Sequence, residues 1–208
     1  MTFTGIPIAA LDFYEDLEND NSKAFWTAHK AIYDEQVKAP ITTLCDELAK
    51  TFGDYKLFRP YRDVRFSRDK TPYKTHQGVW FAETSVYVEV SAAGLRVAGG
   101  YWSTSSPQVQ RLRRAVADDV VGPQLERALA KVRRAGHEVR GEQLTRVPPG
   151  FEKDHPRAEL LRYKTLTAGT MLGVPDWLAT PDARRRIAAS LRSLAPLITW
   201  LNANVGQD

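Results

Sequence analysis

The chain has 208 residues, 43% of them hydrophobic and 26% charged, and 29 Lys and Arg against 25 Asp and Glu give a formal net charge of +4. These values are typical of soluble globular proteins and exclude a disordered or fibrous chain. The length suits one domain, and no apolar run approaches the roughly 18 residues that cross a membrane.

Two helical patterns open the chain. Apolar residues from Ile8 to Leu17 repeat every three or four positions, which predicts a first helix. Ser22 is a suitable N-cap for a second helix with an apolar stripe to Leu48, and we expect a kink or break at Pro40 because proline lacks a backbone donor. Cys45 lies on this stripe, so we interpret it as a core residue rather than a nucleophile.

Three short segments rich in β-branched and aromatic residues follow at 77–82, 86–91 and 95–101. The turn residues between them predict an antiparallel meander. A two-residue turn at 93–94 would keep one face of the meander apolar, because side chains alternate along a strand. The other face would then carry the polar side chains Tyr87, Glu89, Arg96 and Trp102.

The second half of the chain predicts more helices with short strands between them. Ser105 and Pro107 are typical of a helix start, a further helix is expected at 123–135, and a last helix around 187–201 should kink at Pro196. Short strands are expected within 138–144 and at 166–172. We therefore predict an α+β fold in a single domain, residues 1–208, with a central antiparallel β-meander flanked by N-terminal and C-terminal helices.

Positive charge is concentrated in one short segment, residues 59–74. It holds six Lys and Arg against two Asp, and this excess of four equals the formal net charge of the whole chain. Arginine presents a planar fork of donors that matches phosphate or carboxylate. The candidate ligand-binding residues are Arg62, Asp63, Arg65, Lys70, Tyr73 and Lys74. The alternative is structural: Asp63 and Asp69 would pair with neighbouring cations and fix the segment against the sheet.

Two residues are candidates for proton transfer. His76 directly follows the basic segment, and Glu89 projects from the central strand. The structural alternative for Glu89 is a cross-strand ion pair with Arg96. No pair of His or Cys residues has the spacing of metal ligands, so no metal site is expected, and no motif assigns a cofactor.

A second candidate site precedes the helix at Pro107. Gly99 and Gly100 lead into a capped helix start, where free backbone donors favour phosphate if the approach is open. The sequence carries no phosphate-loop or dinucleotide fingerprint, and glycines that close a strand often serve backbone geometry alone. Both interpretations stay open at this point.

Several motifs together resemble a known family. They are the opening Phe3-Thr4-Gly5, the run Arg62-Asp63-Val64-Arg65-Phe66-Ser67 with Asp69-Lys70 and Pro72-Tyr73-Lys74, the sequence Gly99-Gly100-Tyr101-Trp102, and Asp154-His155-Pro156. The chain is similar over nearly its whole length to a family of bacterial and fungal proteins that share a domain of unknown function. The resemblance implies a shared fold and transfers no activity, substrate or cofactor.

The leading hypothesis is a protein that binds a phosphate-bearing or other anionic small molecule between the basic segment and the polar face of the sheet, with enzymatic activity left open. A nucleic-acid-binding module is the alternative, since the sequence pI is about 9.2 and aromatic residues accompany the Arg and Lys residues. A structural or interaction protein is the third. With a single cysteine and no secretion signal, we expect a cytoplasmic protein with no membrane contact.

Overall fold

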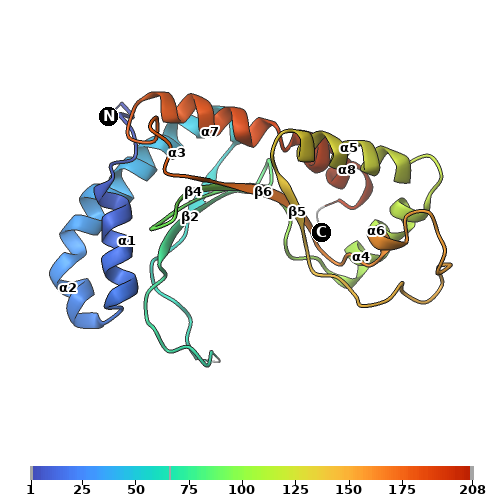
Figure 1. The fold of residues 1–208 in the computed structure, drawn as a ribbon, viewed down its shortest axis with the longest axis horizontal. Helices are drawn as coiled ribbons and strands as arrows, with labels where there is room; N and C mark the ends of the chain where they lie inside the picture. The colour runs from blue at the N-terminus through green and yellow to red at the C-terminus, as the bar shows by residue number, and fades with distance from the viewer. Residues whose placement is uncertain (1, 66, 207–208) are drawn as a thin grey trace. The chain divides into compact units, whose positions relative to one another are not determined.

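A computed structural model describes residues 2–65 and 67–206 (Figure 1). Within these ranges the strands form a six-stranded antiparallel sheet in the order β1-β2-β3-β4-β6-β5. The strands are β1 (Tyr55–Leu57), β2 (His76–Phe81), β3 (Val86–Ser91), β4 (Gly94–Tyr101), β5 (Glu138–Arg140) and β6 (Leu166–Gly173). The helices are α1 (Ala9–Asn19), α2 (Lys23–Ile32), the π-helix η1 (Tyr33–Lys38), α3 (Ala39–Phe52), α4 (Ser106–Ala117), α5 (Gly122–Arg134), α6 (Ala158–Leu161), α7 (Asp182–Arg192) and α8 (Ala195–Asn204).

The predicted α+β class is confirmed, as is the antiparallel meander flanked by helices from both ends of the chain. None of the helices in the described ranges is both long and apolar enough to cross a membrane. The chain forms two compact units. Unit 1 holds the chain up to Val97 together with Met171–Ala189, and unit 2 holds Ala98–Thr170 and the chain from Ser190. A single domain over residues 1–208 stays a prediction.

The N-terminal helices of unit 1 begin and end at residues that the sequence marks. The Ser22 hydroxyl accepts from the Phe25 amide at 3.1 Å and caps α2. Gly53, with a φ of 82°, ends α3. The break expected at Pro40 takes the form of the π-helix η1, directly before a proline in the first turn of α3. A wider turn suits this position because proline cannot donate the next α-helical hydrogen bond.

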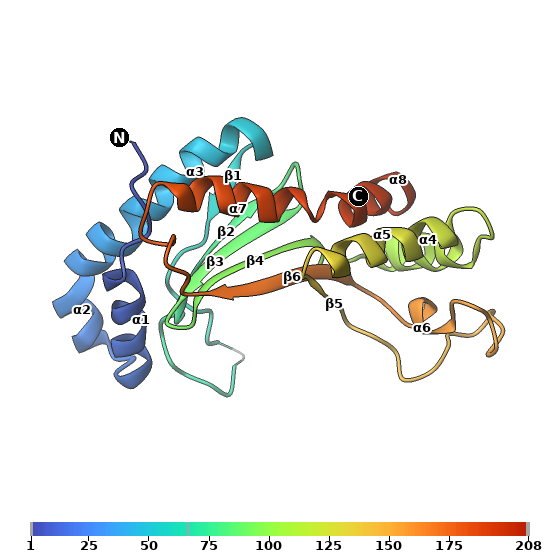
Figure 2. The ribbon, with the colours of Figure 1, turned by 45° about the horizontal axis from the view of Figure 1, so that its top comes forward.

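The meander is built as expected, with one shift at its turn. β2 and β3 pair with Val79 opposite Val88, and both side chains are buried. The turn between β3 and β4 lies at residues 92–93 rather than 93–94. Gly94 is needed in β4 itself, since its φ is 98° and a Cβ there would lie 2.2 Å from the Gly173 carbonyl oxygen. The helices α3 and α7 lie over one face of these strands (Figures 1 and 2).

In unit 2, α4 packs against α5, α6 and α8, and α5 packs against α8 and β5. Ser105 and Gln108 form a reciprocal capping box at the start of α4, as the Ser-Pro signal predicted. Gly100 has a φ of 116°, and a Cβ there would lie 2.5 Å from the Leu166 carbonyl oxygen, so its backbone geometry explains this glycine. The helix expected over 187–201 is interrupted, and α8 begins one residue before Pro196.

Candidate functional site

The basic segment, residues 59–74, runs from β1 to β2 as an arm whose two sides are hydrogen-bonded to each other. The Arg62 amide donates to the Pro72 carbonyl at 2.8 Å, and the Lys74 amide donates to the Pro60 carbonyl at 2.7 Å. Tyr61 and Tyr73 form a β-bridge between these bonds. Because bonds of this kind fix both strands of the arm, its charged side chains project from an ordered base.

Tyr73 attaches the arm to the N-terminal helices. Its ring stacks on Trp26, with centroids 4.4 Å apart and planes 9° apart. Asn21 accepts from the Tyr73 amide at 3.0 Å and donates to its carbonyl at 3.1 Å. Only 4% of Tyr73 is exposed. This candidate ligand-binding residue therefore serves the attachment of the arm.

Both carboxylates of the basic segment are occupied by arginines of the same segment. Arg65 forms a bidentate contact with Asp63: Nε donates to Oδ1 at 2.9 Å, and Nη2 donates to Oδ2 at 2.7 Å. These hydrogen bonds lower the pKa of Asp63. Arg62 contacts both Asp69 and the Thr71 hydroxyl. Hydrogen bonds from Thr71, reinforced by Arg62, lower the pKa of Asp69 to about 2. The ion pairs of the structural hypothesis are thus present.

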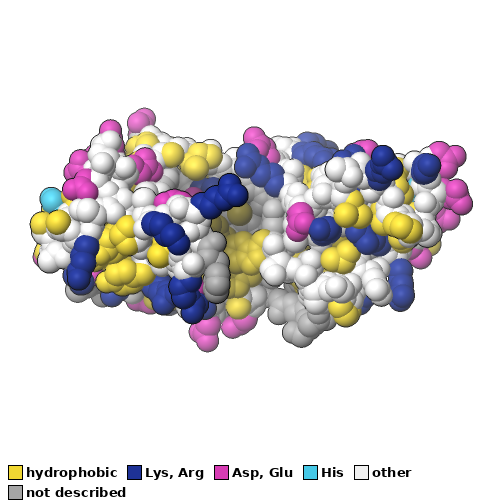
Figure 3. All heavy atoms as spheres, turned by 90° about the horizontal axis from the view of Figure 1, so that it is seen from below, with side chains coloured by type: hydrophobic (Ala, Val, Ile, Leu, Met, Phe, Trp, Pro, Cys, Tyr) yellow, Lys and Arg dark blue, Asp and Glu magenta, His cyan; other side chains and the backbone are white. Residues whose placement is uncertain are grey.

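The remaining cations of the basic segment have other surroundings. In the described part of the chain, no carboxylate lies within ion-pair distance of Arg59, Arg68, Lys70 or Lys74. The Lys70 ammonium donates to the Val64 carbonyl at 2.9 Å, and the Lys74 ammonium lies 5.3 Å from the centre of the Phe58 ring. Figure 3, a view from the side toward which the arm projects, shows Lys and Arg side chains spread over that face. Pairing therefore leaves the positive excess of the segment in place.

The polar face of the meander holds the two proton-transfer candidates together. The Tyr87 hydroxyl donates to Glu89 Oε2 at 2.7 Å, and His76 Nε2 lies 3.9 Å from the same oxygen. The expected ion pair between Glu89 and Arg96 is not among the contacts of the described residues, since Glu89 contacts Tyr87 and His76 instead. Its side chain is only 14% exposed.

Several nearby positive charges act on His76. Burial lowers the pKa of His76, Glu89 opposes this shift, and the nearby charges of Lys74, Arg96 and Arg62 add to it. The imidazole is consequently neutral at pH 7. The charges of Lys74 and Arg62 from the arm and of Arg96 from β4 thus act on one half-buried ring. Among the sequence-predicted residues, His76 and Glu89 face each other, and Lys74 and Arg62 lie near enough to affect the pKa of His76.

The other sequence-predicted residues lie apart from this group. The side chain of Arg65 is 76% exposed and pairs with Asp63, and Lys70 contacts the arm's own backbone. Among the described residues, no three His, Cys, Asp or Glu side chains are grouped as metal ligands would be.

Sequence reasoning missed Tyr14, which α1 places close to this group. Burial raises the pKa of Tyr14, and the charges of Glu89 and Tyr87 contribute. The Tyr14 hydroxyl is buried without a hydrogen-bond partner in the described structure. The helical periodicity of α1 marks this position as core, whereas a tyrosine there also carries a hydroxyl that needs a partner.

A family model described as a conserved hypothetical protein, DUF2461, matches residues 9–200. The chain belongs to the DUF2461 family. No curated protein and no solved structure matches it. The DUF2461 match includes the basic segment, His76 and Glu89, so the group around His76 lies within the shared domain. The DUF2461 description names no activity.

Proposed function

We propose that this protein binds a small molecule carrying a phosphate or another oxyanion where the basic segment joins β2. The proposal rests on the contact of the half-buried His76 with Glu89, 3.9 Å from its Nε2, and on the positive charges of Lys74, Arg96 and Arg62, which lie near enough to lower the pKa of His76. Like charges held close together in a partly desolvated place repel one another, and a bound anion relieves that repulsion. A single bound anion would therefore interact favourably with all of these cations.

The surrounding contacts support ordered cations. Asp69 and Thr71 hold Arg62 in one position, which lowers the entropy lost when its guanidinium binds a ligand. Lys74 packs over Phe58, and burial together with Arg59 lowers the pKa of its ammonium. Tyr87 fixes the Glu89 carboxylate from the sheet. A neutral imidazole that faces a carboxylate is a competent general base, so the same site would permit proton transfer on a bound substrate.

Titration with inorganic sulfate and inorganic phosphate tests the proposal, with binding measured by calorimetry at low ionic strength. Lys74→Ala and Arg96→Ala should each weaken binding about tenfold, the loss expected for one charge-assisted hydrogen bond. Arg68→Ala is the matched control, because it removes one positive charge from the same segment without being among the charges that act on His76. Binding in Arg68→Ala should stay within about twofold of wild type.

Any of three results would overturn the proposal. Equal weakening in all three variants would mean that the anions respond only to net charge. Tight, steeply salt-dependent binding of a single-stranded oligonucleotide, weakened equally by Arg68→Ala, would favour the nucleic-acid-binding alternative. Absence of any anion binding, with Arg62→Ala losing its fold, would leave the basic segment a purely structural ion-pair network.

A further inference from the structure

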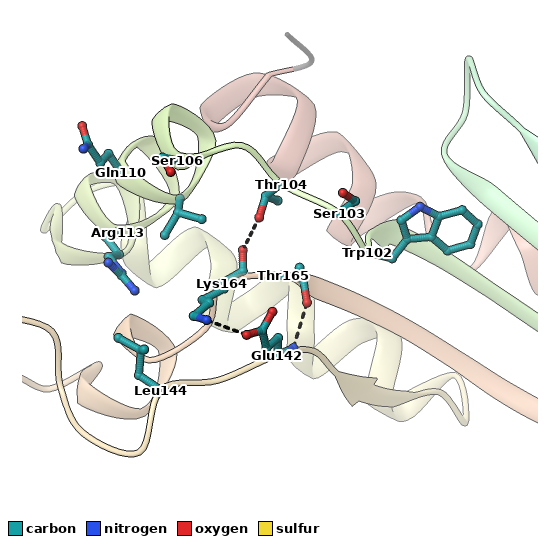
Figure 4. Close-up of a pocket in the computed structure, with 11 residues that line it drawn as sticks. Trp102, Ser103, Thr104, Ser106, Gln110, Arg113, Glu142, Leu144, Lys164 and Thr165 are labelled. Atoms are coloured by element: carbon teal, nitrogen blue, oxygen red, sulfur yellow. Dashed lines mark hydrogen bonds and ion pairs between the residues drawn. The ribbon is translucent and has the colours of Figure 1, made fainter. Parts of the chain in front are cut away.

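Unit 2 contains a pocket of about 650 Å³ beside α4. One wall is a single face of that helix, made by residues at helical spacing: Ser106, Val109, Gln110 and Arg113. The opposite wall comes from the chain after β5 and the chain before β6, with Glu142, Leu144 and Lys164 (Figure 4). Residues 102–104, which follow β4, close the pocket toward the start of α4.

The walls of this pocket are held by hydrogen bonds that leave its shape fixed. The Glu142 amide donates to the Thr165 hydroxyl at 2.8 Å, and the Lys164 amide donates to the Glu142 carbonyl at 2.8 Å. The Thr104 hydroxyl donates to the Lys164 carbonyl at 2.8 Å, which connects residues 102–104 to the wall that holds Lys164. The pocket is therefore formed before any ligand arrives, as ligand sites usually are.

Arg113 is the unusual group in the lining. Its side chain extends from α4 toward Lys164 and Leu144 on the other wall (Figure 4). Its Nε is buried and has no hydrogen-bond acceptor in the described structure. Buried donors in folded proteins nearly always have a partner, so the guanidinium of Arg113 lies beside the pocket with hydrogen-bonding capacity that the described structure does not use.

The charges of the lining indicate the charge of a ligand that would suit this pocket. Lys164 is paired with Glu142, which leaves the charge of Arg113 uncompensated within the pocket. A guanidinium group matches the two oxygens of a carboxylate or phosphate. The start of α4 lies at the same pocket and adds a weak positive potential.

The rest of the pocket suits a molecule larger than a bare ion. Pockets of roughly 300–1,000 Å³ hold small organic molecules. The hydroxyls of Ser103 and Ser106 and the amide of Gln110 line the remaining space and are suited to hydroxyl groups. We infer that this pocket binds a polyhydroxylated small molecule with one oxyanion group, the anion at Arg113 and the hydroxyls along the start of α4.

Sugar phosphates and sugar acids share this chemistry, so the test uses one of each. The full chain is titrated by calorimetry with glucose 6-phosphate, gluconate, glucose and inorganic phosphate. At least one of the first two should bind more tightly than both glucose and inorganic phosphate, and the stronger of the two identifies the anion. Arg113→Ala should weaken that binding about tenfold, whereas Arg114→Ala, one residue along α4 and outside the pocket, should leave it unchanged.

A second variant keeps the test decisive if Arg113→Ala fails to fold. Glu142 is 62% exposed, so Glu142→Gln should fold, and it removes the negative charge of the pocket and releases Lys164. Binding of the anionic sugar should then tighten. Lys74→Ala should not affect it, which separates this pocket from the proposed site at His76. Unchanged binding in both Arg113→Ala and Glu142→Gln, or no preference for the anionic sugars, would overturn the inference.

Discussion

Gly78 and Tyr87 lie so close across β2 and β3 that a Cβ on Gly78 would come within 2.3 Å of the Tyr87 hydroxyl oxygen. The bare backbone of Gly78 leaves room for the Tyr87 ring, whose hydroxyl reaches Glu89. A glycine inside a strand thus marks the place where a neighbouring side chain crosses over it.

We therefore predict that Gly78→Ala destabilises the protein by about 1–3 kcal/mol, the usual result of forcing extra atoms into a packed region. The free energy of unfolding in urea measures this. The double variant with Tyr87→Phe should recover part of the loss, because it removes the atom nearest to the new methyl group. Strictly additive losses would show that the two side chains do not collide.

Arg157 is predicted to hold the end of α4. It is 7% exposed and donates to the carbonyls of Val116, Ala117 and Asp118 at 2.6, 3.1 and 3.2 Å. Arg157→Met removes these charge-assisted bonds and should cost about 2–3 kcal/mol in the free energy of unfolding. Asp119→Asn is the control, since that exposed partner should contribute less than about 0.5 kcal/mol. A loss in Asp119→Asn as large as that in Arg157→Met would refute this reading.

Local signals in the sequence predicted most of the architecture. Ser22, Gly53 and Ser105 act through bonds or backbone angles within a few residues, so the boundaries that they set were found from sequence. The π-helix before Pro40 was not predicted, because a proline indicates that one backbone donor is lost but not which helix geometry the chain adopts in response. The turn between β3 and β4 lies at 92–93 instead of the predicted 93–94. Glycine is required at position 94 because the chain passes close to Gly173, which is distant in sequence.

The candidate site was predictable where its residues are close in sequence. Lys74 and His76 are near neighbours, and alternation along β3 put Tyr87 and Glu89 on one face. The partner of Glu89 depends on distances in the folded structure, which the sequence does not give. The predicted ion pair with Arg96 was therefore wrong, and Glu89 contacts Tyr87 and His76 instead. The pocket at Arg113 joins segments that are far apart along the chain, although its start was indicated by the capped helix at Pro107.

Arg62 is predicted to order the basic segment. It joins Asp69 and Thr71, which lie on the far side of the arm, whereas Arg65 forms its ion pair with Asp63, two residues away. Arg62→Ala should therefore speed amide hydrogen exchange at Thr71 and Lys74 by about tenfold or more, since local opening becomes easier. Arg65→Ala should leave the exchange at both amides near its wild-type rate. If these two amides exchange at the same rate in both variants, Arg62 does not order the segment.

The affinity of the proposed anion site should depend on pH through His76. Burial lowers the pKa of this group below 6.5 in the free protein, and a bound anion stabilises the imidazolium and so raises that pKa. By linkage, the association constant for sulfate, which does not titrate in this range, should rise as the pH falls below about 6.5 and be flat above the pKa of the bound form. The increase cannot exceed about tenfold per pH unit for one proton.

Calorimetric titrations with sulfate between pH 5 and 8, values chosen to bracket the imidazole at about 6.5, measure this dependence. His76→Gln should abolish it while retaining binding near neutral pH, because the wild-type ring is already neutral there. His29→Gln is the matched control, since that imidazole stacks on Phe25 in α2 and its Nδ1 donates to the Phe25 carbonyl at 2.8 Å. A pH dependence that persists in His76→Gln, or that disappears in His29→Gln, would show that another group takes up the proton and that the cations around His76 do not form the site.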